Sequence, residues 1–377
     1  MAGIYIHIPY CRKACHYCNF HFSTTRYNAP EMQSAILHEV ELQKDYLAGA
    51  PVHTIYFGGG TPSILPPEWI AEIIQQIKTF HQVSNEAEIT LEANPDDIHE
   101  ASLATWQAAG INRLSIGVQS FKEADLLWMN RAHSAEEALA SIRLALRAGI
   151  QDISLDLIYG TPYLTDKDWI ANLDQALALG VSHLSAYALT VEPSTALFKM
   201  IQKGKIPEVD SDKQSRQFDL LMDWAHEKGY EHYEISNLAR PGHRSKHNSS
   251  YWKGIPYLGL GPAAHSYNGR TRKWNIENNP LYIKGIKAAD SSVSTEEILT
   301  RANKINETIM IELRMMEGLD LAAFKARFGE LEMERLLRLS GELISRGLAR
   351  LAQDRLVLTR QGKHFADSAA ADLFVED

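Results

Sequence analysis

The sequence predicts an α/β fold: an incomplete (β/α)6 barrel of the TIM type, followed by a C-terminal α+β region that includes a winged-helix-like module. Three observations predict it. Six short apolar runs recur over the first half of the chain, and each is followed by turn residues and a helical pattern, as in parallel βα units. Within these runs, apolar and polar residues alternate. Near the C-terminus the pattern changes to consecutive helices and a hairpin.

The six apolar runs are expected to form neighbouring parallel strands, because a segment long enough for a helix separates each run from the next. Six strands are too few for an eightfold barrel, so the barrel should be incomplete. The expected strands are Gly3–Pro9, His53–Phe57, Glu88–Asn94, Arg113–Gln119, Asp152–Ile158 and His183–Leu189.

The first connecting segment, Pro30–Leu47, illustrates the helical pattern. Met32, Ile36 and Val40 recur every four residues, which predicts an amphipathic helix with one apolar face. Three acidic residues are expected on other faces of this helix: Glu31, Glu39 and Glu41.

Alternation within the strands indicates a polar barrel interior. In the first strand Ile4, Ile6 and Ile8 alternate with Tyr5 and His7. Parallel strands covered on both faces are normally apolar throughout, and barrel interiors are normally filled with branched apolar side chains. We therefore expect the apolar face to pack on the outer helices and the polar face to line a lumen that binds a polar ligand. An exposed sheet face would give the same pattern, but six helix-flanked strands disfavour it.

Polar or glycine-rich sequences follow the strands at the ends where barrels carry functional residues. The second strand runs into Gly58–Pro62, GGGTP, whose missing Cβ atoms would let a ligand approach the backbone; a tight turn is the structural alternative. Glu92, Gln119 and Asp156 end three further strands on equivalent faces. They could hold the ammonium and ribose hydroxyls of a nucleoside-type ligand, although a single such carboxylate could be a hydrogen-bonded core residue.

All three cysteines lie in one loop directly after the first strand. Cys11, Cys15 and Cys18 have the spacing Cys-x3-Cys-x2-Cys. A [4Fe–4S] cluster is normally ligated by four cysteines, so three would leave one iron open for another ligand. An odd cysteine count disfavours disulfides. Zinc is the alternative, because Cys3His sites exist and the neighbouring histidines His7, His16 and His21 could each supply a fourth ligand.

Composition sets the class of protein. A chain of 377 residues favours more than one domain. The net charge of -9 argues against a phosphate-tracking nucleic-acid surface, and no apolar run reaches the ~20 residues of a membrane span. The opening MAGIYIHIPYC lacks a basic n-region and is expected to be a strand and not a signal peptide. We expect a cytoplasmic protein.

The C-terminal region is expected to be a separate module. Ser291–Glu297 is interpreted as a polar linker, and Leu348–Thr359 as a hairpin with Gln353-Asp354 at its turn. Helices followed by a hairpin suggest a winged helix, but the acidic balance disfavours DNA binding, so a protein-contacting or lid role is preferred. Helical patterns fill Leu299–Met316, Leu319–Phe328 and Glu330–Arg346. The expected domains are 1–228 for the barrel, 229–290 for an extension and 298–377 for the C-terminal domain.

The cysteine loop and the GGGTP sequence resemble those of the radical S-adenosylmethionine (SAM) superfamily. More narrowly, the segments YIHIPYC, CHYCNF, YFGGGTPS, EANP, GVQSF, NRAH and DLIYGTP are similar to the oxygen-independent coproporphyrinogen dehydrogenase family. The resemblance extends from about Gly3 to about Leu189, with further motifs beyond.

This resemblance implies a [4Fe–4S] cluster on Cys11, Cys15 and Cys18, with SAM bound to the open iron through its amino and carboxylate groups. Arg131, in NRAH, would supply a permanent positive charge and several N–H donors in one plane. The alternative for Arg131 is an ordinary surface ion pair. The positions that match the SAM site of the family are Tyr5, Gly59, Gly60, Thr61, Glu92, Gln119, Arg131 and Asp156.

The sequence differs from the coproporphyrinogen dehydrogenases in two features, and a further motif points to one branch of the family. Coproporphyrinogen dehydrogenases carry a fourth cysteine two residues after the third and an extension before the barrel, whereas this chain has Phe20 at that place and opens on the first strand. Downstream lies an HNxxYW motif, His247–Trp252. Both features resemble the HemW branch, the radical SAM haem chaperones. The resemblance implies a protein that binds haem and delivers it to acceptor proteins, with coproporphyrinogen III dehydrogenase and a zinc-stabilised binding module as the alternatives.

If the cysteines hold a cluster, the axial ligand of haem must be His, Met or Tyr. The segment Gly242–Tyr267 contains His243, His247 and His265 among several aromatic residues. His247, within the HNxxYW motif, is the candidate haem ligand. A hydrogen-bonded core histidine is the alternative for each of the three. A homodimer is expected only because dimers are the commonest oligomers.

Overall fold

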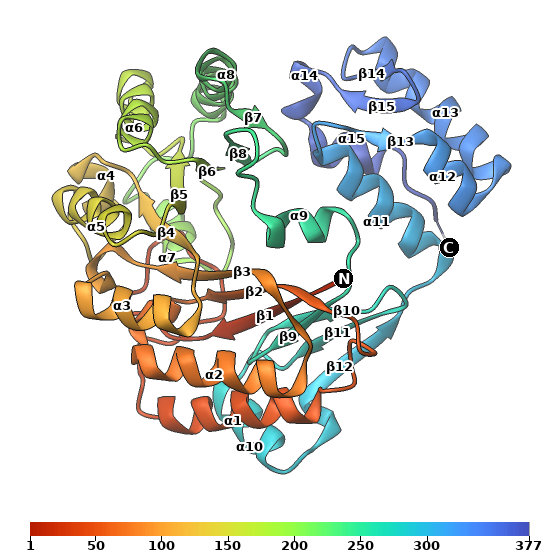
Figure 1. Cartoon of the computed structure of the whole chain (residues 1–377). Coiled ribbons are helices and arrows are strands. Elements are labelled where there is room, and N and C mark those ends of the chain that lie inside the picture. Colours follow the sequence, from red (N-terminus) through yellow and green to blue (C-terminus); the bar gives the residue numbers. More distant parts are fainter. Residues whose placement is uncertain (377) are drawn as a thin grey trace.

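The structure is a computed structural model that describes residues 1–376 (Figure 1). Its centre is one open sheet of twelve strands, in the order β12-β11-β10-β9-β1-β2-β3-β4-β5-β6-β8-β7. Strands β1 to β6 follow one another in chain order and each is parallel to the next. The predicted incomplete βα barrel is therefore confirmed. Its strands are β1 (Ala2–Ile8), β2 (Val52–Gly59), β3 (Val83–Ala93), β4 (Arg113–Gln119), β5 (Asp152–Tyr159) and β6 (His183–Ala188).

Helices connect these strands and cover the outer face of the curved sheet (Figure 1). The apolar residues of the alternating pattern, such as Ile4, Ile6 and Ile8, are fully buried in the core formed with these helices. The connecting helices are α1 (Ala29–Leu42), α2 (Pro67–Phe80), α3 (Glu100–Ala109), α4 (Glu123–Trp128), α5 (Ala135–Arg147) and α6 (Asp166–Ala178). After β6 follow α7 (Ala196–Gln202), which meets the cysteine loop through Leu197 N and His16 O, and α8 (Ser211–Lys228).

Helix α1 differs from the prediction at Glu39, which was expected on a polar face. Its side chain is 1% exposed and accepts hydrogen bonds from Gly261 N, Asn275 Nδ2 and Tyr282 Oη at 2.7, 2.7 and 2.6 Å. Glu39 follows Ile36 by three residues and so borders the apolar stripe. Segments more than 200 residues away cover that border, which local periodicity does not report.

The segment after α8 extends the sheet at both edges. At one edge β8 pairs antiparallel with β6, and β7 pairs with β8. At the other edge β9 lies parallel to β1 and is followed by an antiparallel meander. This parallel strand was not predicted. The elements are β7 (Glu231–His232), β8 (Asn237–Ala239), α9 (Lys246–Trp252), β9 (Tyr257–Leu260), β10 (His265–Tyr267), β11 (Thr271–Asn275), α10 (Asn279–Lys287) and β12 (Ser294–Ile298).

The predicted linker Ser291–Glu297 is wrong. Ser291–Val293 forms a 3-10 turn, and β12 pairs antiparallel with β11 over its whole length, from Ser294 opposite Asn275 to Ile298 opposite Thr271. As an edge strand, β12 is mostly exposed, so its sequence is polar and carries no apolar alternation. Backbone hydrogen bonds to β11 make it a strand.

The C-terminal domain has the helix, strand, helix, helix, strand, strand order of a winged helix, which confirms the predicted module. Its sheet has the order β13-β15-β14, and the predicted hairpin pairs Ala349 with Leu358 through Ala352 with Arg355. A second apolar core lies inside this domain. The elements are α11 (Arg301–Arg314), β13 (Leu319–Asp320), α12 (Leu321–Phe328), α13 (Glu330–Ser345), β14 (Ala349–Ala352), β15 (Arg355–Leu358), α14 (Arg360–Lys363) and α15 (Ala366–Ala371).

No helix among residues 1–376 has both the length and the apolar character needed to cross a bilayer.

Candidate functional site

The inner face of the barrel is polar, as the alternation predicts. Tyr5 of β1 stacks on Tyr56 of β2 with ring centroids 6.1 Å apart, and Tyr56 Oη donates to Glu92 Oε1 of β3 at 2.8 Å. Ser115 of β4 donates to Asp156 Oδ1 of β5 at 3.3 Å. Five adjacent strands thus bring tyrosine and carboxyl groups together in one lumen.

The pKa values of both lumen carboxyl groups are raised toward neutrality. Burial, and then the nearby Asp156 carboxylate, raise the pKa of Glu92 to about 7. Burial likewise raises the pKa of Asp156 to about 6, against the hydrogen bonds from Ser185 and Ser115. An opposite charge nearby favours the ionised form of a carboxyl group. The lumen is therefore suited to a cationic ligand, which would stabilise both carboxylates.

The cysteine loop follows β1 at the C-terminal end of the barrel strands. Cys11, Cys15 and Cys18 are free thiols of intermediate exposure. Thr61 Oγ1, from the GGGTP sequence, donates to Cys11 Sγ at 3.4 Å. Arg131 Nη1 donates to Cys15 Sγ at 3.3 Å. Donors directed at the sulfurs stabilise thiolates, and hydrogen bonds to cluster sulfurs are a means by which proteins tune such centres.

The NRAH segment after α4 fastens the cysteine loop. Arg131 Nη2 donates to Asn94 Oδ1 and to Gly117 O, both at 2.7 Å, so the guanidinium that meets Cys15 is fixed from two strands. Asn130 Nδ2 donates to the Ala14 carbonyl inside the loop at 2.9 Å. Arg131 therefore does not form the surface ion pair that was the alternative; its partners are Cys15, Asn94 and Gly117. Asn94, in EANP, was missed as a site residue, and its place at the end of β3 was the signal.

A second contact attaches the cysteine loop to the residues that follow β3. The Arg12 guanidinium contacts Asp97 and lies 3.2 Å from Asp96 Oδ2. Ser63 Oγ donates to Asp97 Oδ2 at 2.8 Å and accepts from Asn94 N at 3.1 Å. The cysteine loop, the GGGTP turn and the end of β3 are therefore one hydrogen-bonded unit.

Two of the glycines in GGGTP are required by packing. Gly59 has a φ of +106°, and a Cβ there would lie 2.6 Å from the His7 ring. A Cβ on Gly60 would lie 2.7 Å from the Tyr10 carbonyl oxygen. Gly60 N and Thr61 N donate to carbonyl groups at the end of β1 and in the cysteine loop, at 2.9 and 2.7 Å. The positive φ and the His7 ring account for Gly59, and close approach of backbone to backbone accounts for Gly60. Their contact with SAM stays a prediction.

Gln119 ends β4 in a left-handed conformation, with a φ of +70°. Non-glycine residues rarely adopt it, and such strain is often found at functional sites. Gln119 Nε2, Arg131 Nη2 and Asn94 Oδ1 all surround Gly117, within 3.5 Å of where a Cβ would stand. Polar side chains from the ends of two strands, β3 and β4, and from NRAH thus meet around Gly117.

The donor set fits a cubane better than a single zinc ion. His7 has hydrogen bonds at both ring nitrogens, to Tyr5 and to the His21 carbonyl. His16 Nδ1 and His21 Nε2 are engaged by Trp128 O at 2.7 Å and Asn279 Oδ1 at 2.8 Å. Among residues 1–376, no group of three His, Cys, Asp or Glu side chains converges as on one metal ion. Cysteines on a cubane bind separate iron corners, so their sulfurs need not converge on one point.

His247 lies at the other end of the lumen, on α9. Its Nδ1 and Nε2 are 2.9 and 2.8 Å from Thr54 Oγ1 and Tyr251 Oη, and its ring stacks on Tyr56 at 4.9 Å. The ring is 1% exposed, and burial lowers its pKa to about 3. Ligation of haem would require it to release one hydroxyl partner. The other two histidines considered for haem lie elsewhere: His243 is exposed beside Asp152, and His265 stacks on Trp274.

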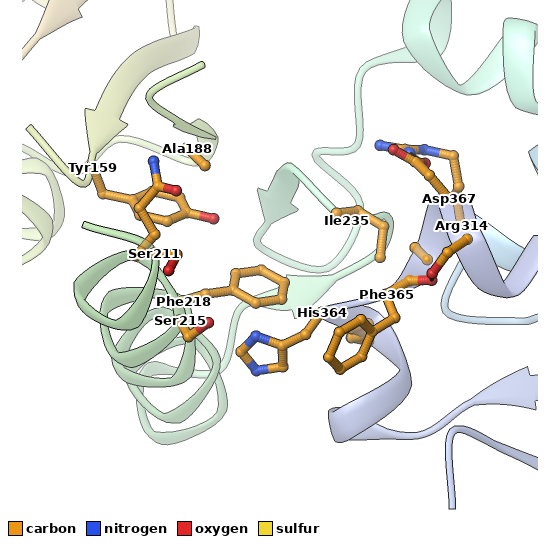
Figure 2. Close-up of a pocket in the computed structure, with 14 residues that line it drawn as sticks. Tyr159, Ala188, Ser211, Ser215, Phe218, Ile235, Arg314, His364, Phe365 and Asp367 are labelled. Atoms are coloured by element: carbon orange, nitrogen blue, oxygen red, sulfur yellow. Dashed lines mark hydrogen bonds and ion pairs between the residues drawn. The ribbon is translucent and has the colours of Figure 1, made fainter. Parts of the chain in front are cut away.

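Two cavities separate the barrel from the C-terminal domain. One, of about 440 Å³, lies between α8, the ends of β5 and β6, and the helices α14 and α15. Figure 2 shows Phe218 of α8 facing His364, with Arg314 and Asp367 on another wall. The other, of about 770 Å³, lies at the N-terminal end of the barrel strands. Neither was predicted, because each is formed by residues distant in sequence.

Comparison with known proteins agrees with these features. The family model of the radical SAM superfamily matches residues 5–176, and that of the HemN C-terminal domain matches residues 299–365. The fold is that of coproporphyrinogen III oxidase HemN from Escherichia coli, with a TM-score of 0.86 at 23% identity, covering 99% of this chain and 90% of that one.

Relatives in sequence span nearly the whole chain. Heme chaperone HemW of Mycobacterium tuberculosis is 36% identical over 375 residues, which cover 98% of this chain and 94% of that protein. Heme chaperone HemW of Bacillus subtilis is 33% identical over 371 residues, 96% of each chain. The mitochondrial radical S-adenosyl methionine domain-containing protein 1 of Mus musculus is 35% identical over 283 residues, 73% of this chain and 64% of that one. The chain therefore belongs to the HemW family within the radical SAM superfamily.

Proposed function

We propose that this protein is a cytoplasmic haem chaperone that carries a [4Fe–4S] cluster and SAM, binds haem, and transfers it to acceptor proteins. The observation that carries the proposal is the cysteine loop above the polar lumen. Its thiols at Cys11 and Cys15 receive hydrogen bonds from Thr61 and Arg131. Similarity to the heme chaperones HemW over almost the full length supports the haem function.

Cys11, Cys15 and Cys18 would hold the cluster and leave one iron open, and a bound cluster supplies an electron and a site for the amino and carboxylate groups of SAM. The chain's own residues do the rest. Arg131 fixes Cys15 and balances its charge, Asn94 orients Arg131, and the Glu92 and Asp156 carboxyl groups favour a cation in the lumen. Tyr5, Gly59, Gly60, Thr61 and Gln119 complete the proposed SAM site.

The alternative is oxygen-independent coproporphyrinogen III dehydrogenase activity. The likeness in fold to HemN, at 23% identity, does not decide between the two. Phe20 stands where that enzyme family has a fourth cysteine, and its side chain is 67% exposed. An exposed apolar side chain cannot replace a thiolate, so this departure favours the chaperone.

One anaerobic experiment tests the proposal. The full chain, reconstituted with iron and sulfide, is assayed for acid-labile sulfide, haem uptake by absorbance titration, 5′-deoxyadenosine release and oxidation of coproporphyrinogen III. We expect a cluster, stoichiometric haem uptake, transfer of haem to an apo-acceptor such as apomyoglobin, and no coproporphyrinogen oxidation. Oxidation of coproporphyrinogen III would contradict the assignment as a chaperone. Absence of both iron and sulfide would contradict the proposal that the cysteines bind a cluster.

Cys15→Ala tests the proposed ligand set, because it removes one cysteine of the loop and leaves Cys11 and Cys18 in place. It should prevent cluster assembly, with loss of the brown absorbance and of sulfide. Wild-type levels of iron and sulfide in Cys15→Ala would contradict the assigned ligand set.

A further inference from the structure

The larger cavity, about 770 Å³, lies at the end of the barrel opposite the cysteine loop. Its size falls in the range of ~300–1,000 Å³ typical of small-molecule sites. His53 and Thr54 at the start of β2 form one wall, Trp252 and Lys253 of the α9 region a second, and Met315 and Arg355 of the C-terminal domain a third. Figure 1 shows the N-terminus and α9 between the sheet and α11, where these walls meet.

Helix α9 has two faces with different partners. His247 and Tyr251, four residues apart, face the lumen and bond to each other. Ser249 and Trp252 line the cavity instead. The HNxxYW segment therefore divides between two sites: its histidine and tyrosine belong to the lumen, and its two serines and its tryptophan line the cavity.

Two buried polar atoms on the cavity wall lack partners within residues 1–376. They are Ser249 Oγ and Trp252 Nε1. Buried polar groups are nearly always hydrogen-bonded, so such a pair calls for an explanation. Both can donate, and both come from the same helix turn. A ligand with acceptor oxygens would satisfy them.

Two lysines flank these donors. Lys246 and Lys253 also line the cavity, and seven helix residues separate them by roughly 10 Å along the axis. Neither forms an ion pair in the part of the chain that the structure describes, whereas Arg355 is paired with Asp320 at 2.8 Å and Arg244 with Glu231 at 2.8 Å. Four carboxylates also line the cavity, those of Glu86, Glu312, Glu317 and Asp320, and Glu317 and Asp320 are the ones paired with Arg244 and Arg355. Lys246 at the start of α9 and Lys253 directly after it therefore stay available to a ligand that carries carboxylates.

The remaining walls offer donors for iron. His53 lines the cavity, and no described residue hydrogen-bonds to its ring. Met315 lines it from the C-terminal domain, while the sulfur of its neighbour Met316 accepts from Arg244 Nη2 at 3.0 Å. Histidine with methionine is a known pair of axial ligands for haem.

We infer that this cavity is the haem site, with the haem carboxylates on Lys246, Ser249, Trp252 and Lys253, and with His53 and Met315 as the donors to iron. The inference rests on the proposed haem-binding function and assigns its location. Haem would then lie about 20 Å from the cluster, since the seven residues of β1 span roughly 3.3 Å each. Thr54, which lines the cavity and bonds to His247, separates haem from the lumen.

The smaller cavity is the competing place, because it also contains a histidine. His364 packs edge-on against Phe218 at 5.0 Å and lies 3.4 Å from Asp219 Oδ1. Arg314 on its wall is already paired with Asp367 at 2.5 Å. Its histidine and the Arg314 Nη1 atom therefore have partners, whereas Arg314 Nε has none among the described residues. This cavity serves as the control.

The test is haem titration of the full chain, followed by absorbance and electron paramagnetic resonance. His53→Ala and Met315→Leu should each change the spin state of bound haem, and His53→Ala should weaken haem binding about tenfold, equivalent to about 1.4 kcal/mol. Controls are His364→Ala, His243→Ala and Met316→Leu, which should match wild type. Circular dichroism and thermal midpoints confirm that each variant is folded.

Metal-free protoporphyrin IX distinguishes the residues that would bind the carboxylates from those that would bind iron, because it has the carboxylates and no iron. Lys246→Ala/Lys253→Ala should weaken both haem and the metal-free porphyrin, whereas His53→Ala should weaken haem alone. Cys15→Ala should bind haem as wild type does, because the cluster lies at the other end of the barrel.

Three results would overturn the inference while leaving the proposed function intact: wild-type haem spectra in both His53→Ala and Met315→Leu, loss of haem in His364→Ala alone, or loss in Cys15→Ala. Failure of the wild-type chain to bind haem would instead overturn the proposed function.

Discussion

Individual residues of the lumen gain their chemistry from burial and neighbours. Glu92 alone would be an ordinary carboxylate. Burial, and then the nearby Asp156 carboxylate, raise its pKa to about 7, against the hydrogen bond that Tyr56 donates to it. The same principle applies at Arg131, whose contact with Cys15 depends on Asn94 and Gly117. These dependences can be tested by substituting single residues.

Glu92 predicts a pH dependence of stability in the cluster-free protein. Its folded pKa, about 7, lies above the ordinary value of 4.5, so the folded state binds its proton more tightly than the unfolded state. The free energy of unfolding should therefore fall as pH rises from about 4.5 to about 7. Glu92→Gln should reduce this slope, measured by urea unfolding across that range. An identical slope in wild type and variant would contradict the raised pKa.

Asn94 predicts how firmly the cluster is held. Asn94→Ala should leave the three cysteines in place but free one side of Arg131, so the cluster should be lost about tenfold faster to a chelator, as for other supporting residues of metal sites. Iron release followed by absorbance measures this. Gln75→Ala, on the exposed face of α2, is the control. Equal release rates for Asn94→Ala and wild type would show that Arg131 needs no support from β3.

Among the elements, β9 extends the parallel part of the sheet beyond β1 and depends on a polar network. Glu39 of α1 accepts hydrogen bonds from the turn after β9, from β11 and from α10. This buried acceptor joins α1 to three elements that each lie more than 200 residues further along the chain. It also positions β9, which pairs with β1 from Gly3 to Ile6 beneath the lumen.

Removing the Glu39 carboxylate should be costly. Glu39→Ala leaves three donors without an acceptor, so the free energy of unfolding should fall by about 3 kcal/mol or more. Glu41→Ala, exposed on the same helix, should change it by less than about 0.5 kcal/mol. Urea unfolding compares the two. A loss in Glu39→Ala as small as that in Glu41→Ala would mean that the network contributes nothing.

At the scale of the whole molecule, the C-terminal domain rests on the barrel through contacts of unequal weight. Arg360 pairs with Asp219 at 2.8 Å and with Asp223, all about half exposed. Arg314 lies 4.0 Å from the buried Glu234, and a backbone bridge joins Glu234 to Met315. The wall of the larger cavity that contains Met315 and Arg355 depends on this docking.

The two arginines should therefore differ on substitution. Arg360→Ala should lower the free energy of unfolding by less than about 1 kcal/mol, because exposed pairs are screened by water and salt. Arg314→Ala should cost about 2 kcal/mol, because it removes the cation nearest a buried carboxyl group. Chemical denaturation at low and high salt measures both. A larger loss for Arg360→Ala would reverse this ranking.

Much of the fold could be predicted locally. The six barrel strands, the helix pattern around Ile36 and the hairpin with its turn at Gln353 are confirmed, because periodicity reports which side of an element is buried. The strand β9 and the edge strand β12 were not found. Tyr257–Leu260 is short, and Ser294–Ile298 is polar and exposed, so neither carries a periodic signal. Their pairing partners alone make them strands.

The family, the cysteine spacing and the order of the βα units could all be identified before folding was considered, because each depends on residues that are close together in the chain. Which polar groups meet could be seen only in the packed molecule. Packing joined Arg131 to Cys15 and Glu92 to Tyr56, and it placed Ser249 and Trp252 opposite the C-terminal domain. The physical reason is that hydrogen-bond partners and cavity walls come from segments far apart in the chain, whose contacts exist only after the sheet and the two domains have packed.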